Sequence, residues 1–200
     1  MPKLRDLYDL LQEHLRVDDE DPSVLFHLVW AEDVLLDEFA RKLGAEADSA
    51  FQTRYSQLVD TAPGRCLWGD RIGSWVQAFL EWDVPDDSHV RALSQGGRRA
   101  FSIKSGYNNY SLLEWAVDGE IVTSFTVDWP DPKGGSDPHA LDHLMEGLHF
   151  QLEEPGPTPD PVTVEVSLTS ALRLAGRITG HELTEAWLAD VHTCYPLRSG

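Results

Sequence analysis

The sequence predicts an α+β protein: a curved antiparallel sheet of about five strands, with helices packed on one face and an N-terminal helical cap. Three observations predict this fold class. Apolar residues recur at helical spacing in residues 1–62, the spacing changes to two within residues 63–152, and a Pro-rich connector at 153–161 precedes C-terminal helices expected in residues 162–200. With 42% hydrophobic residues in a chain of 200, we expect one compact domain overall.

The N-terminal residues carry three helical patterns. Residues 4–15 place leucines on one stripe, and residues 25–43 repeat that spacing. Pro22 suits the first turn of the second helix, where a missing N–H costs nothing, and Gly44 suits its end. Residues 50–59 predict a third, shorter helix.

Residues 65–70 and 74–82 are rich in aromatic and branched side chains and predict a first hairpin. The second of these strands is apolar on both faces, with Trp75 and Phe79 on one side and Val76, Ala78 and Leu80 on the other. Such a strand should be central and covered on both sides. A short helix at 88–93 and a strand at 98–104 follow.

The clearest local signal is the Asp118-Gly119 pair. Apolar residues alternate before it, in 113–117, and after it, in 121–127. Asp-Gly readily adopts the positive φ angles of a type I′ turn. The sequence therefore predicts a hairpin here, with Gly119 at positive φ.

The remaining residues predict helices around a connector. A helix begins at Pro138, and another, short one is capped by Thr184. Four prolines in 153–161 exclude regular structure there. Residues 162–168 alternate like a strand but lead into helical spacing, so their pattern leaves helix and strand open.

Charge and composition narrow the function classes. Sixteen Lys and Arg against 34 Asp and Glu give a net charge of −18, which opposes binding to nucleic acid or to anionic lipid. No segment has the length and apolarity of a signal peptide or a membrane span, so we expect a cytoplasmic protein. Cys66 and Cys194 lie far apart in the sequence and are expected to be buried thiols.

Several short motifs, in order, resemble an uncharacterised family of actinobacteria such as Streptomyces, the domain-of-unknown-function family number 6461. They are Leu93-Ser94-Gln95-Gly96-Gly97-Arg98, Ala116-Val117-Asp118-Gly119, Val122-Thr123-Ser124-Phe125, Asp137-Pro138-His139-Ala140-Leu141-Asp142 and Leu183-Thr184-Glu185-Ala186-Trp187-Leu188. The resemblance covers roughly residues 68–190 and implies a helix for much of 165–179. It implies no activity or catalytic residues. The chain departs from the family pattern at His139, where Asp is usual, and at 105–110.

His139 and His143 are the candidate metal ligands. On one helix they would share a face, as two imidazoles binding one ion require. A third ligand at motif spacing is missing from the sequence, and Asp137 is expected to cap the helix. A solvated helix face is therefore favoured, and we expect no metal and no cofactor.

Glu81 and Glu114 are the candidate catalytic residues. Each stands in an otherwise apolar strand beside a tryptophan, so each could be a partly buried carboxylate that lines a pocket. A position at the rim of the sheet is favoured for both. No motif identifies a nucleophile, and the residues do not establish whether the protein is an enzyme.

Aromatic residues at strand ends are the candidate binding residues. Trp82, Tyr107, Tyr110 and Trp129, with Asp83, Asp86 and Asp87, are expected to form an aromatic surface rimmed by acid. Such a surface suits a basic protein partner or a cationic or aromatic small molecule.

The sequence therefore favours an acidic cytoplasmic interaction protein of the immunity or inhibitor type, which binds a basic protein partner. The alternative is an enzyme or small-molecule-binding protein of specialised metabolism, with a cleft lined by Trp and Glu between the sheet and the N-terminal helices. The sequence does not reveal the partner or substrate, or the oligomeric state.

Overall fold

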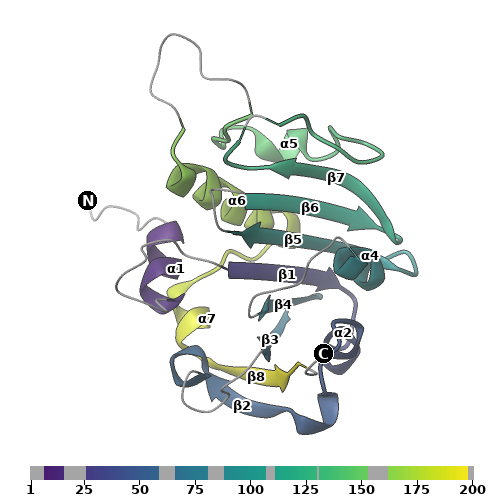
Figure 1. The fold of residues 1–200 in the computed structure, drawn as a ribbon, viewed down its shortest axis with the longest axis vertical. Helices are drawn as coiled ribbons and strands as arrows, with labels where there is room; N and C mark the ends of the chain where they lie inside the picture. The colour runs from purple at the N-terminus through teal and green to yellow at the C-terminus, as the bar shows by residue number, and fades with distance from the viewer. Residues whose placement is uncertain are drawn as a thin grey trace.

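One antiparallel sheet of eight strands organises the protein in the computed structural model, which describes residues 7–15, 26–58, 66–80, 88–106, 111–129, 131–152 and 162–197 (Figure 1). The strands are β1 (Phe26–Glu32), β2 (Phe51–Arg54), β3 (Cys66–Ile72), β4 (Trp75–Leu80), β5 (Arg99–Ser105), β6 (Ser111–Val117), β7 (Glu120–Thr126) and β8 (Val191–Pro196). The helices are α1 (Leu7–Leu15), α2 (Leu36–Lys42), α4 (Ser88–Ser94), α5 (Asp142–Met145), α6 (Val164–Thr179) and α7 (Glu185–Ala189), with short 3₁₀ turns η1 (Ala47–Ser49) and η2 (Tyr55–Gln57). The predicted α+β class is confirmed, but the predicted count of five strands is too low.

The strand order is β2-β8-β3-β4-β1-β5-β6-β7, and the sheet is open. β1 pairs antiparallel with β4 on one side and with β5 on the other. The helix predicted over 25–43 is therefore wrong: its first part is β1, and only Leu36–Lys42 is helical. A short apolar run buried on both faces gives the same pattern as a buried helix, and here strand pairing decides.

β2 occupies an edge of the sheet and contains the first residues of the helix predicted over 50–59. The next residues of that segment, Tyr55–Gln57, form the 3₁₀ turn η2. The N-terminal helical cap is not confirmed, because β1 and β2 both belong to the sheet and α1 is the helix that the described residues place before them.

Helices cover both faces of the sheet rather than one. α1, α6 and α7 pack on the first face, called here the α6 face, through residues such as Leu11, Leu172 and Leu188. α2 and α4 pack on the other, the α4 face, through Phe39 and Leu93 (Figure 1). Central strands that are apolar on both sides require cover on both sides.

β4 shows this two-sided burial, as the sequence predicts. It is buried throughout and lies between β3 and β1. Trp75 and Phe79 join the core of the α6 face, whereas Val76, Ala78 and Leu80 join the core of the α4 face.

The predicted hairpin at Asp118-Gly119 is confirmed as the connection of β6 and β7. Asp118 has φ 49° and Gly119 has φ 83°, as a type I′ turn requires. The Asp118 carboxylate also accepts hydrogen bonds from the backbone N–H groups of Gly96 (3.0 Å) and Gly97 (2.8 Å). The turn is thus tied to the segment between α4 and β5.

The C-terminal part contains one strand that the sequence does not predict. α6 resolves the ambiguity at 162–168 in favour of a helix, capped by Thr163 and ended by Gly180 in the left-handed region. Thr184 caps α7, as predicted. β8 then inserts between β2 and β3, so helices alone do not account for residues 162–197.

His192 ties β8 to the neighbouring elements. Its ring stacks on Trp187 of α7 at 4.3 Å and meets Trp68 of β3 edge-on at 4.6 Å, and its Nε2 donates to the Trp187 carbonyl at 2.7 Å. Cys194 on β8 and Cys66 on β3 are buried and form no disulfide, as expected.

The remaining expectations concern residues 138–161 and helices that could span a membrane. The helix predicted from Pro138 begins only at Asp142, because turns occupy residues 138–141. The Pro-rich connector at 153–161 lies outside the described residues. Among the described helices, none combines the length and apolarity needed to cross a membrane.

Replacement of Gly119 by valine should destabilise the protein by at least about 1 kcal/mol, because a β-branched residue is strained at φ 83°. Gly119→Asn is the matched control, since asparagine tolerates this region. Urea denaturation measures both. Equal stability of the two variants would contradict the role given to the turn.

Candidate functional site

Trp129 follows β7 and is one of four large hydrophobic residues that are exposed in the described part of the chain. Its side chain is 59% exposed. Two hydrogen bonds converge on its carbonyl, from the Thr126 hydroxyl (3.0 Å) and the Asp131 N–H (2.8 Å). The turn is held in place while the indole faces solvent.

Carboxylates lie on both sides of Trp129 in the sequence. Asp131 is exposed, whereas Asp128 is buried. One oxygen of Asp128 accepts the Ser111 N–H at 3.1 Å, and the other is buried without a hydrogen-bond partner. Burial raises the pKa of the Asp128 carboxyl, and the hydrogen bonds from Ser111 oppose that rise.

The other candidate binding residues, Trp82, Asp83, Asp86, Asp87, Tyr107 and Tyr110, lie outside the described residues, as does Glu81. The described residues next to these segments nevertheless share one end of the sheet. Leu80, which ends β4, pairs with His27 at the start of β1. Ser105, which ends β5, pairs with Ser111 at the start of β6, and the Ser111 carbonyl accepts the N–H of Val127. Trp129 follows at this same end.

Glu114 lies in the middle of β6, opposite Ser102 and Ser124. Its neighbours Leu113 and Trp115 belong to the core of the α6 face, so the alternation of a strand places Glu114 on the α4 face. The Ser102 hydroxyl donates to its carboxylate at 3.4 Å. Glu114 is half-buried.

The α4 face also brings together three residues that the sequence does not single out. His27 on β1 is buried and pairs with Lys104 on β5, and His89 belongs to α4. Burial, followed by the charges of Lys104 and His89, lowers the pKa of His27 to about 3. The sequence conceals this cluster because residues 25–43 resemble a helix.

His139 and His143 do not share a helix face. His139 lies in the turn before α5, and its Nδ1 is 2.9 Å from Asp142 Oδ2. Lys133 also pairs with Asp142, and these bonds lower the pKa of that carboxyl. No group of three His, Cys, Asp or Glu suited to a metal ion is found within the described ranges.

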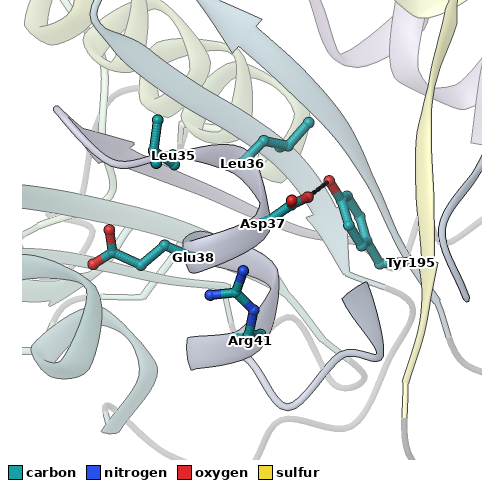
Figure 2. Close-up of a pocket in the computed structure, with 6 residues that line it drawn as sticks. All are labelled: Leu35, Leu36, Asp37, Glu38, Arg41 and Tyr195. Carbon is teal, nitrogen blue, oxygen red and sulfur yellow. Dashed lines mark hydrogen bonds between the residues drawn. The ribbon is translucent and has the colours of Figure 1, made fainter. Parts of the chain in front are cut away.

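An open depression of about 560 Å³ lies beside α2, lined by Leu35, Leu36, Asp37, Glu38, Arg41 and Tyr195 (Figure 2). The Tyr195 hydroxyl donates to Asp37 at 2.7 Å. Burial and this bond raise the pKa of Tyr195. Glu38 is paired with Arg98 at 2.6 Å. None of the candidate residues from the sequence lines this depression.

The fold and these sites define an α+β protein with one open antiparallel sheet and an exposed tryptophan flanked by acid. Residues 78–194 match the family described as "Family of unknown function (DUF6461)". Because the match spans more than half of the chain, the chain belongs to this family, as the resemblance indicated. No curated protein and no solved structure matches the chain.

His27 should make stability depend on pH. The native state keeps this imidazole neutral down to a pH of about 3, whereas the unfolded chain protonates it below about 6.5. The unfolded state therefore binds more protons in this window. As the pH falls from 6.5 towards 3, His27 should lower the free energy of unfolding by about 1.4 kcal/mol per pH unit. In His27→Gln, urea denaturation should show a shallower pH dependence; an unchanged slope would contradict the burial of a neutral ring.

Proposed function

We propose that this protein is an acidic interaction protein, of the immunity or inhibitor type, that binds a basic protein partner through Trp129 and the exposed carboxylate of Asp131. The observation that carries the proposal is the exposed indole of Trp129, held by a hydrogen-bonded turn between Asp128 and Asp131. Such an arrangement favours recognition of a cationic side chain.

The free energy of burying its side chain favours Trp129 as the anchor residue of an interface. Burying a large apolar side chain contributes about 1.5–3 kcal/mol, and a cation over an indole adds about 0.5–2 kcal/mol. A fixed turn reduces the ordering cost of binding. Residues of this kind, desolvated at the centre of an interface, act mainly on the dissociation rate.

The net charge supports a basic partner in particular. At −18, the chain attracts cations over distances set by a Debye length of about 8 Å at physiological salt. Association should therefore be fast at low salt and slower as salt rises.

The alternative, an enzyme or small-molecule-binding protein with a cleft lined by Trp and Glu beneath the N-terminal helices, has less support. Buried apolar residues form the core on the face that α1 covers, and Trp30 and Trp68 are among them. Glu114 lies on the opposite face.

The proposal is tested with a photo-crosslinking amino acid at position 129 in the native host, with position 35 as the control. Leu35 is the matched site because it is also an exposed hydrophobic residue, 66% exposed, and lies beside α2. We expect position 129 to crosslink to a basic protein that position 35 does not capture. An acidic target, or equal capture at both positions, would contradict the proposal.

Binding kinetics of the purified protein and its partner then distinguish the anchoring role of Trp129 from the electrostatic steering by Asp131. Trp129→Ala should raise the dissociation rate about tenfold or more, equivalent to about 1.4 kcal/mol, whereas Leu35→Ala should not. Asp131→Lys should slow association more than Glu165→Lys, which changes the net charge equally in the first turn of α6. Surface plasmon resonance at several salt concentrations measures these rates, and association that is insensitive to salt would overturn the charge argument.

A further inference from the structure

The depression beside α2 combines an apolar wall with charged side chains (Figure 2). Leu35, the residue before the helix, is 66% exposed, and Leu36 next to it is half-buried. At about 560 Å³, the depression has the volume of a small-molecule site, in which apolar surface holds the ligand and a few polar groups orient it. The two leucines therefore offer a place for an apolar group.

The two carboxylates of the depression differ in the hydrogen bonds that they accept. Both oxygens of Glu38 accept from the Arg98 guanidinium, at 2.6 and 3.4 Å. Asp37 is exposed and accepts from the Tyr195 hydroxyl through Oδ1 at 2.7 Å. In the described part of the chain no bond reaches the Asp37 Oδ2 atom, so this oxygen can still accept one.

Arg41 supplies the positive charge of the depression. Its side chain is exposed and makes no hydrogen bond or ion pair with the described residues, so its five N–H donors face solvent. Arg41 and Asp37 are four residues apart on α2 and therefore lie on one face of the helix. The depression thus presents an unpaired guanidinium and a carboxylate oxygen as neighbours that do not bond to each other.

We propose that this depression binds a small apolar zwitterion of the class of the hydrophobic amino acids. The ligand carboxylate pairs with Arg41, its ammonium group donates to Asp37 Oδ2, and its apolar chain covers Leu35 and Leu36. A carboxylate on a guanidinium forms two parallel hydrogen bonds, which fix the orientation of the ligand.

Charge favours a ligand that is neutral overall. Glu38 and Arg98 neutralise each other, which leaves one positive and one negative group for the ligand. The net charge of −18 repels an anion at a distance, and Arg41 repels a cation at close range. A zwitterion meets neither barrier. This site is independent of the interaction proposed for Trp129, because it lies beyond the end of β1, whereas Trp129 lies at the end of the sheet where β1 begins.

The test uses the full chain, with the backbone amides of α2 observed by NMR. L-Leucine is titrated at constant ionic strength and at a pH where amines are protonated. Three analogues are titrated in the same way: glycine lacks the apolar chain, N-acetyl-L-leucine lacks the ammonium group, and L-leucinamide lacks the carboxylate. We expect saturable shifts with L-leucine and binding about tenfold or more weaker with each analogue. Absence of a saturable shift with L-leucine, or equal binding of any analogue, would overturn the proposal.

Variants establish where the ligand binds. Arg41→Gln should weaken L-leucine binding about tenfold or more, because it removes the partner of the carboxylate. Arg173→Gln is the matched control and should not weaken it, because Arg173 is exposed on α6 at the opposite face of the sheet. Leu35→Ser gives a second test if Arg41→Gln does not fold. Unchanged affinity in a folded Arg41→Gln or Leu35→Ser variant would contradict the assignment.

Discussion

The pairing of β1 with both β4 and β5 is the interaction on which the rest of the fold depends. It joins β2, β8, β3 and β4 on one side to β5, β6 and β7 on the other. Val29 enters the core of the α4 face and Trp30 that of the α6 face, so β1 also holds both helical layers. Without β1, the two groups of strands would each expose an edge. The family match begins at residue 78, after β1, although this strand lies in the middle of the sheet.

β1 also lies next to the candidate functional residues. Its first residues lie at the end of the sheet where β4 and β5 finish and where Trp129 follows β7. The α4 face is apolar beneath α2 and α4, through Phe39 and Leu93, but carries His27, Lys104 and Glu114 on β1, β5 and β6. These polar residues thus lie on the same face of the sheet as that apolar core.

Local rules explain what the sequence predicts well. Asp118-Gly119 specifies its turn through positive φ angles, Thr184 caps α7 with its hydroxyl, and the two apolar faces of β4 indicate a central strand. The same local reasoning predicts that Trp129 lies beyond the end of a strand, because it stands directly before Pro130 and proline disfavours a continuing strand.

Non-local strand pairing explains why the sequence pattern does not predict β1 and β8. β1 is a short apolar run that a buried helix could also contain, and β8 gains its stability from β2 and β3, which are distant in the sequence. His27 and Lys104 are 77 positions apart and meet only because β1 and β5 pair. Their cluster could not be inferred before that pairing was known.

Hydrogen exchange of the β1 amides is the most direct test of this arrangement. If β1 is the strand that unites the sheet, the amides of Val29 and Trp30 should exchange only through global unfolding, with the same free energy as the most protected amides of β4 and β5. Exchange of β1 through local opening, while β5, β6 and β7 remain protected, would contradict it.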